Sequence, residues 1–254
     1  MLTTRTNRFP MLILLALGLL FVLLLSARTP AEAATVVVDG NGNGDFTSIQ
    51  DAIDNANEGD TLRVWEGRYT ETIVVDKTLI IEGNGTQTSI IDGGGAGSVV
   101  NITADQVNLS GFRIEDAGST GDHSGIWLGA DWCHLSKLYL PNNRHGIYLY
   151  QAQSNNITEV NVSGSEMHGV YFTGSSNNMM DDSSVYQSKY LGVWLDDSSD
   201  YNIVLGNTVL ESGWNGFNIA DSSYNNFEDN EVMNNGWNGF NLLGGSSHNA
   251  LRDN

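Results

Sequence analysis

Hydrophobic and polar residues alternate in a pattern that repeats through the second half of the chain. A glycine followed by large apolar residues one and three positions later returns with gaps of 21, 23, 23, 24 and 23 residues, at Gly125, Gly146, Gly169, Gly192, Gly216 and Gly239. Alternation of this kind predicts a short strand with one buried face. A fixed period in the low twenties indicates one coil of a stacked array, because a single coil cannot bury its own apolar face.

Further columns of similar residues follow the glycines. Two are apolar and read Leu135, Ile157, Met179, Ile203, Phe227 and Leu140, Val162, Val185, Val209, Val232. A third column lies just before the first of these, in Ser/Asn/Asp-rich turns, and reads Asn156, Asn178, Asn202, Asn226, Asn249. We expect these amides to hydrogen-bond along the stack as a ladder. Each coil then holds short strands without room for a helix, paired in parallel ~4.8 Å apart. We therefore predict an all-β fold, a parallel β-helix.

The segment before the coils predicts a cap for the apolar core. Residues Thr47–Gln50 look like a capping box that opens a short helix with an apolar face of Ile49, Ala52, Ile53 and Ala56. We expect this helix to cover an open end of the core, within a capping region at 34–75, and regular coils at 123–254. The sequence stops at Asn254 inside a coil, without a terminal repeat that has a polar outer face, so we expect a fragment truncated at its C-terminus.

Residues 1–33 are expected to lie outside the β-helix domain, which would span 34–254. Arg5 and Arg8 precede an uncharged apolar run from Met11 to Leu25, and Ala31-Glu32-Ala33 follows as a small-x-small cleavage pattern. This order predicts a secretory signal peptide, since the apolar run is short for a membrane span of ~20 residues. We predict an exported protein that is secreted, periplasmic or on the cell surface, with no membrane insertion after cleavage.

The charge balance narrows the class of partner. The chain has 11 basic and 30 acidic residues, a net charge of −19, and loss of residues 1–33 leaves eight basic and 29 acidic residues, a net charge of −21. Such a surface repels nucleic acid and anionic lipid, and it favours cations or neutral partners. Cys133 is the sole cysteine, so no internal disulfide stabilises the exported chain.

Five motifs open the mature chain and lead to a family resemblance. They are Asp39–Gly44, Asp45–Ile53, Glu58–Leu62, Glu66–Glu71 and Leu79–Gly83. Together they resemble the opening of the pectin-lyase-like right-handed parallel β-helix superfamily. Residues 123–254 resemble the NosD-like repeats of that superfamily, in which Gly-φ-x-φ is followed by Ser/Asn turns. The resemblance implies a right-handed coil, and the NosD name implies an association with copper delivery in the periplasm.

The enzyme branches of this superfamily imply catalytic motifs that these 254 residues lack. The Asp-Phe-Ile-Phe-Gly and Gly-Arg-Pro-Trp motifs of pectin methylesterases and the Asp-Pro-His-Asp motif of alginate epimerases have no match. Polygalacturonases place paired aspartates one coil before Gly-His-Gly, whereas Asp181-Asp182 and Asp196-Asp197 come after His145 and His168. No complete active site is found, so enzymatic activity stays open. A polysaccharide lyase or hydrolase with its site partly outside this fragment is an alternative.

Aromatic residues that face outward are the candidate binding site. The position two after each glycine reads Trp127, Tyr148, Tyr171, Trp194, Asn218, Asn241, and the position two before reads His123, Arg144, Met167, Tyr190, Trp214, Trp237. Strand parity predicts a flat, exposed strip ~15 Å long from Trp127, Tyr148, Tyr171 and Trp194, with a shallow groove over the glycines. Such strips suit sugars, whose C–H faces lie on rings. We predict that these four residues bind a polysaccharide or glycan; sheet packing alone is the alternative.

Two metals are considered as cofactors. His145 and His168 share a position in adjacent coils and would be neighbours able to ligate copper, although no third ligand repeats in that column. The acidic turns Asp181-Asp182, Asp196-Asp197 and Glu228-Asp229 would offer oxygen ligands to calcium. A solvated acidic edge is the alternative reading of these turns.

Overall fold

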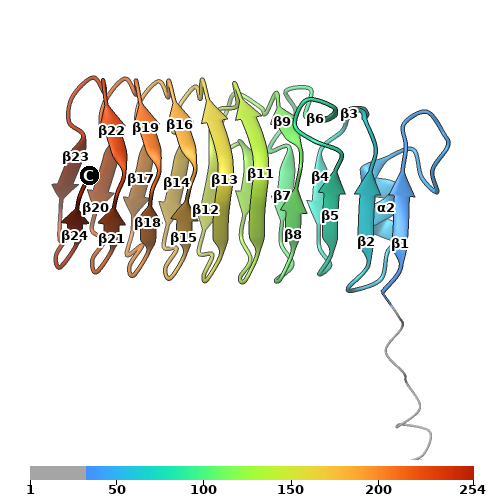
Figure 1. Ribbon diagram of the computed structural model, residues 1–254, viewed down its shortest axis with the longest axis horizontal. Helices are drawn as coiled ribbons and strands as arrows, with labels where there is room; N and C mark the ends of the chain where they lie inside the picture. The colour runs from blue at the N-terminus through green and yellow to red at the C-terminus, as the bar shows by residue number, and fades with distance from the viewer. Residues whose placement is uncertain (1–32) are drawn as a thin grey trace, which may run out of the picture. The chain divides into compact units, whose positions relative to one another are not determined.

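The computed structural model describes residues 33–254, which form one compact unit. The predicted signal peptide, apart from its last residue, lies outside the described residues. The unit is a stack of coils joined by parallel strand pairing, and Figure 1 shows them side by side in sequence order, from β1 to β24.

The strands form three rows along the stack. The first row contains β1 (Thr35–Val38), β2 (Thr61–Val64), β5 (Ile80–Gly83), β8 (Asn108–Ser110), β11 (His134–Pro141), β13 (Asn156–Ser163), β15 (Met179–Asp181), β18 (Ile203–Leu205), β21 (Asn226–Glu228) and β24 (Ala250–Arg252). The second contains β3 (Gly67–Thr70), β6 (Ser89–Asp92), β9 (Arg113–Glu115), β16 (Ser184–Tyr186), β19 (Thr208–Leu210) and β22 (Glu231–Met233). The third contains β4 (Ile73–Val75), β7 (Val100–Ile102), β10 (Ser124–Leu128), β12 (His145–Tyr150), β14 (Val170–Thr173), β17 (Val193–Asp196), β20 (Phe217–Ala220) and β23 (Phe240–Leu243). The long strands β11 and β13 take part in the first two rows and join them into one 16-stranded sheet, while the third row is an 8-stranded sheet.

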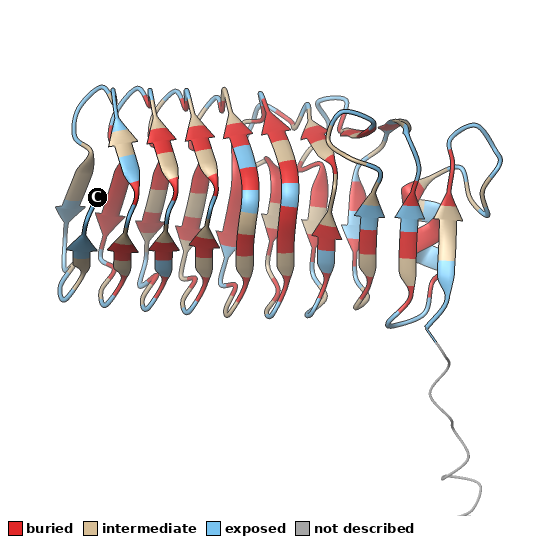
Figure 2. Ribbon diagram, in the orientation of Figure 1, coloured by how far each residue is buried: buried red, intermediate tan, exposed pale blue. Residues whose placement is uncertain are grey.

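The register of the 8-stranded sheet confirms the repeat read from the glycines. Ile126 pairs with Ile147, and the same column continues through Val170, Val193, Phe217 and Phe240. Leu140, Val162, Val185, Val209 and Val232 also stack as predicted. Figure 2 shows that these buried positions recur along each row of strands, whereas the final strands β23 and β24 have no buried residue. The parallel β-helix architecture is confirmed.

One predicted apolar column is wrong by one residue in two coils. Met180 and Val204 are buried in the core, whereas Met179 is half-buried and Ile203 is 44% exposed. Asn178 and Asn202 precede these strands, and the buried apolar residue lies two positions after the asparagine rather than one. A one-residue shift in a strand exchanges the buried face for the exposed face.

The asparagine ladder exists, but it uses a different residue in two coils. Its rungs are Asn155, Asn178, Asn202, Asn225 and Asn249, joined by amide–amide hydrogen bonds of 3.0, 3.2, 3.1 and 3.1 Å. The predicted rungs Asn156 and Asn226 instead begin strands β13 and β21. A second ladder, which the sequence analysis missed, joins Asn207 to Asn230 at 3.1 Å and Asn230 to Asn254 at 2.7 Å.

Each regular coil turns at four corners, and each corner contains a residue with positive φ. In the coil after β14 these residues are Gly174, Asn177, Asp182 and Gln187, with φ of 59°, 59°, 46° and 53°. Glycine, asparagine and aspartate tolerate this left-handed region better than other residues. The Ser/Asn/Asp-rich turns in the sequence therefore mark corners that are bent by single left-handed residues.

The glycines of the repeat allow close packing rather than lining a groove, contrary to the expectation. A Cβ added to Gly192 would lie 2.4 Å from Cγ1 of Val209 in the core and 2.6 Å from the carbonyl oxygen of Gly216 in the next coil. We expect Gly192→Ala to lower the free energy of unfolding by roughly 2 kcal/mol. Gly239→Ala is the matched control in the same column, because its nearest neighbour would be 3.5 Å away. Urea unfolding followed by circular dichroism checks both variants, and equal losses would contradict the steric explanation.

The predicted helix is α2 (Ile49–Asn55), the single helix within residues 33–254. It buries Ile49, Ala52 and Ile53 as expected and packs on β1, β2 and β4 near the first coils. Its N-cap is Ser48 rather than the predicted Thr47, and the carboxylate of Glu71 accepts hydrogen bonds from the amides of Ile49 and Gln50 at 2.9 and 3.0 Å. Within the described part of the chain, no helix has the length and apolar character needed to cross a membrane.

Candidate functional site

Three of the four predicted aromatic residues lie in one stack on the outer face of the 8-stranded sheet. The ring centroids of Tyr148 and Tyr171 are 4.9 Å apart with an interplanar angle of 17°, and those of Tyr171 and Trp194 are 4.3 Å apart at 11°. Trp127 does not join this stack and pairs with Tyr150 at 6.3 Å. These strands bring the residues together because β12, β14 and β17 are paired in register.

The expected flat, exposed strip is wrong in its geometry. Tyr148 is only 6% exposed, and the stacked rings cover one another's faces. Trp127 turns away along its own chain because Gly129 has no side chain, and a Cβ at Gly129 would lie 2.2 Å from the indole ring. Strand parity predicts which side a residue occupies, but it does not predict how its ring is rotated.

A cavity of about 520 Å³ lies beside this stack. Its lining residues are Met167, His168, Tyr190, Leu191, Trp194, Trp214, Asn215, Asn218, Trp237, Asn241 and Leu243. We call it the aromatic groove. Of the four predicted site residues, only Trp194 lines it. The two outward columns, at the positions two before and two after each repeat glycine, supply most of the remaining lining residues. The groove therefore lies between these columns, but no glycine lines it as the sequence analysis expects.

Two tryptophans that precede the strands form one wall of the aromatic groove. Trp214 and Trp237 stack with centroids 4.9 Å apart and rings within 5° of parallel, and they are 39% and 65% exposed. Tyr190 meets Trp214 edge-on at 4.6 Å. The segment Gly-Trp-Asn-Gly-Phe-Asn occurs at 213–218 and again at 236–241. This repeated segment was the sequence signal for a second aromatic wall.

Amide side chains give the aromatic groove its polar groups. The side chain of Asn215 donates to Oδ1 of Asn218 at 3.2 Å, and Asn241 donates to the same oxygen at 2.8 Å. Asn238 donates to Oδ1 of Asn215 at 3.1 Å. These mutual hydrogen bonds fix the amides in place, so the groove presents oriented donors and acceptors beside apolar rings.

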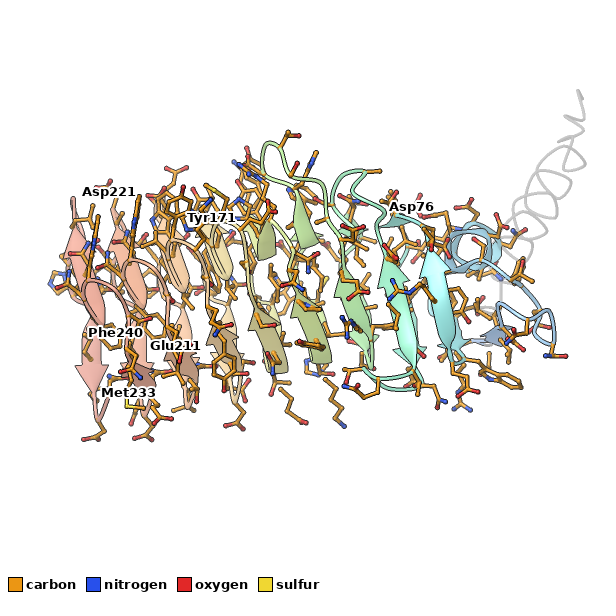
Figure 3. The ribbon with its side chains drawn as sticks, turned by 90° about the horizontal axis from the view of Figure 1, so that it is seen from above. Asp76, Tyr171, Glu211, Asp221, Met233 and Phe240 are labelled. Carbon is orange, nitrogen blue, oxygen red and sulfur yellow. The ribbon has the colours of Figure 1, made fainter. Side chains whose placement is uncertain are left out.

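An acidic side chain lies beside the aromatic stack. The hydroxyl of Tyr171 donates to Oδ2 of Asp196 at 3.3 Å. Burial raises the pKa of the Asp196 carboxyl, and burial also raises the pKa of Tyr171 to about 12. In Figure 3, Tyr171 lies along the same long side of the solenoid as Asp221, opposite Glu211 and Met233. The outer face near Asp196 therefore combines a phenol with a carboxyl that gains a proton more readily than usual.

His145 and His168 are neighbours, as predicted, with ring centroids 5.3 Å apart. Both are buried, and burial lowers the pKa of His145 to about 4 and of His168 to about 3. The amide of Leu191 donates to Nδ1 of His168 at 3.3 Å. Within residues 33–254, no group of three or more His, Cys, Asp or Glu side chains is arranged to hold a metal ion. The copper and calcium expectations therefore gain no ligand set from the described residues.

Comparison with known proteins identifies the family of this fold. Residues 124–254 match the family described as Right handed beta helix region. A relative, the cell surface glycoprotein of Methanothermus fervidus, is 32% identical over 113 residues, which are 43% of this chain and 18% of that protein. The matched part is thus less than a fifth of the relative's length.

Solved structures with low sequence identity share the architecture. The alginate lyase from Paenibacillus sp. str. FPU-7 has a TM-score of 0.51 at 12% identity, over 85% of this chain and 98% of that chain. The catalytic domain of the GH87 alpha-1,3-glucanase in complex with nigerose has a TM-score of 0.62 at 14% identity, over 80% of this chain and 39% of that chain. The likeness shows the fold, and the family match spans the regular coils. The chain belongs to the family of right-handed β-helix regions and has a pectin-lyase-like fold.

Proposed function

We propose that the protein is an exported carbohydrate-binding protein whose aromatic groove holds a glycan. The observation that carries this proposal is the pairing of three indole rings, from Trp194, Trp214 and Trp237, with fixed amides in one cavity of about 520 Å³. The apolar C–H faces of a sugar ring pack on indole, while its hydroxyl groups need hydrogen-bond partners. A cavity of this size is typical of a ligand site.

The charges favour a neutral glycan. None of the residues that line the aromatic groove is aspartate, glutamate, lysine or arginine, and burial keeps His168 neutral at physiological pH. The whole chain carries a net charge of −19, which repels anionic polymers at long range. A neutral sugar chain avoids this repulsion and needs no ion to bridge the two surfaces.

The stacked rings predicted from the sequence extend this site along the solenoid. Trp194 belongs both to the groove lining and to the stack with Tyr171 and Tyr148. A glycan longer than the groove would therefore continue past Trp194 over the half-buried ring of Tyr171 toward Trp127. The four predicted residues thus remain proposed contacts, with Trp194 inside the groove and the others beyond it.

The relatives support location and ligand class. The similar protein of Methanothermus fervidus is named a cell surface glycoprotein, which agrees with an exported chain. The structural neighbours are named as an alginate lyase and an alpha-1,3-glucanase, and both names denote proteins that act on polysaccharides. These names support the proposal that this protein is exported, whether secreted, periplasmic or on the cell surface.

The double variant Trp214→Ala/Trp237→Ala is expected to weaken glycan binding at least tenfold, about 1.4 kcal/mol, because both stacking rings of one wall are removed. A glycan array, run with and without calcium on the chain starting at Ala34, identifies the ligand. Titration followed by tryptophan fluorescence then measures the affinity. Trp65→Ala is the matched control, since Trp65 is 47% exposed and does not line the groove. Unchanged affinity in the double variant, or no glycan bound at all, would overturn the proposal.

A polysaccharide-processing activity is the second candidate, and Asp196 is the observation that favours it. A carboxyl with a raised pKa beside a phenol can act as a general acid or base in the cleavage of a glycosidic bond. Release of reducing ends from bound polysaccharide measures this activity. Asp196→Asn should abolish that release while binding persists, and activity that survives the substitution would exclude Asp196 from the chemistry.

A further inference from the structure

A second set of aromatic residues lies at one corner of the solenoid. At this corner each coil leaves the 8-stranded sheet and enters the 16-stranded sheet, so the corner and the tryptophan wall of the groove flank opposite ends of the third-row strands. One residue per coil bends the chain there, and these residues are Gln106, Trp132, Ser154, Asn177, Tyr201, Tyr224 and His248, with φ between 57° and 60°.

Bulky residues are unfavourable at such a position. The left-handed region brings Cβ close to the backbone, and asparagine suits it far better than an aromatic residue. Ser154 and Asn177 show what the corner accepts in other coils. Burial does not compensate, since Trp132, Tyr201 and Tyr224 are 65%, 55% and 48% exposed. The fold requires positive φ at this corner in every regular coil, but burial does not explain why aromatic residues rather than asparagine occupy it at Tyr201 and Tyr224.

The corner rings form a regular exposed stack. Tyr201 and Tyr224 have centroids 5.0 Å apart with planes within 6°, and Tyr224 and His248 are 4.8 Å apart within 8°. Ile203 beside them is 44% exposed and adds apolar surface. Ser223 and Ser247 add hydroxyls that are 3.2 Å apart. The corner thus offers evenly spaced ring edges, phenol hydroxyls and serine hydroxyls in a row along the solenoid axis.

We propose that this corner stack of Tyr201, Tyr224 and His248 is a second glycan contact that lies along an extended chain of equatorially linked neutral sugars. The proposal rests on the proposed glycan-binding function and adds a separate contact to it. The rung spacing of about 5 Å is similar to the advance per sugar in such an extended chain, so successive sugars meet successive rungs. Axially linked chains coil and lose this register. The negative charge of the protein again favours a neutral ligand.

Adsorption to insoluble glycans tests the corner separately from the groove. The probes are microcrystalline cellulose and chitin, which are equatorially linked, and granular starch, which is axially linked. The corner variant is Tyr201→Asn/Tyr224→Asn, because asparagine occupies this position at Asn177. We expect at least fivefold weaker adsorption to cellulose or chitin, unchanged titration with soluble oligosaccharide, and a melting temperature that does not fall. Wild-type protein should prefer the equatorially linked glycans to starch.

Several outcomes would overturn the corner contact. These are equal adsorption of wild type and corner variant, equal adsorption of wild type to starch and cellulose, or no adsorption by wild type. A lower melting temperature with undiminished adsorption would show that the stack only stabilises the fold. The Trp214→Ala/Trp237→Ala variant separates the two proposals. If soluble glycans bind it normally, the groove proposal fails, while the corner result can still be read from the insoluble glycans.

Discussion

Asn202→Ala is expected to lower the free energy of unfolding by roughly 3 kcal/mol or more, because it removes a central rung of the buried ladder. Oδ1 of Asn202 accepts hydrogen bonds from the backbone and side-chain amides of Asn178 at 2.9 and 3.2 Å. Its Nδ2 donates to the carbonyl of Ser175 at 3.0 Å and to Oδ1 of Asn225 at 3.1 Å. Alanine would leave the backbone amide of Asn178 and the carbonyl of Ser175 buried without these bonds, and buried unpaired groups cost their desolvation. The side chains of Asn178 and Asn225 would keep their bonds to the carbonyl of Ala152 and to the backbone amide of residue 202.

Asn156→Ala provides the control for this expectation. Asn156 was predicted as a rung, but it is half-buried at the start of β13 and makes none of the ladder bonds. We expect a change within about 1 kcal/mol at this position. Urea unfolding of both variants, followed by circular dichroism, measures the difference. Similar losses at Asn156 and Asn202 would contradict the ladder as the structure assigns it.

Acidification from pH 7 to pH 4 is expected to destabilise the protein by roughly 3 kcal/mol for each of two buried histidines. Burial holds the pKa of His145 near 4 and that of His168 near 3 in the folded chain, whereas an unfolded histidine has a pKa of about 6.5. Arg144 lowers both folded values further. Between these values the unfolded chain binds protons that the folded chain does not. This contribution to stability is therefore present above about pH 6.5 and is lost as the pH falls toward 3.

The variant His145→Leu/His168→Leu isolates this effect, because Leu191 fills the same position in the following coil. Thermal unfolding measured at intervals from pH 7 to pH 4 should show a clearly shallower loss of stability in the variant than in the wild type. If stability falls equally with pH in the variant and the wild type, the acid sensitivity comes from carboxyl groups instead. His168 also lines the aromatic groove, so glycan titration at pH 7 should accompany the unfolding measurements.

The architecture could be predicted because the residue types that stacking requires recur in the sequence at a fixed period. A glycine such as Gly192 faces Val209 of its own coil and Gly216 of the next coil too closely for a side chain, and this constraint repeats in most coils. The apolar column after it follows from strand parity and was correct through Phe240. The helix α2 was recognisable from its apolar face, but Glu71 as partner of its first amides was not, since Glu71 is 22 residues from Ile49.

The errors arose where neighbouring residues are chemically equivalent. Asn155 and Asn156 are adjacent, as are Asn225 and Asn226, and only the position of the corner decides which one enters the ladder. The corner residue has positive φ and stands just before the rung, as Ser154 does before Asn155. Serine, tyrosine and tryptophan have no preference for this left-handed conformation, so their presence in the sequence does not indicate where the corner lies.

The site was harder to predict than the fold because rings can rotate. Tyr171 and Trp194 were assigned to the correct face, yet their stacking hides the surfaces expected to be open. Trp214 and Trp237 lie outside strands, so parity gave no information on their direction. The structure shows that these two residues line the same cavity as Asn218.

The corner and ladder residues also bear on how a gene for such a protein can change. Each coil from β12 onward carries its own ladder asparagine, its own corner residue and its own outward ring, so copying the DNA for one coil would add a complete layer without redesign of the others. The repeated Gly-Trp-Asn-Gly-Phe-Asn segments at 213–218 and 236–241 are what such copying would leave behind. Recombination between similar repeats would then lengthen or shorten the aromatic groove and the corner stack by whole coils, and with them the length of the proposed glycan contact.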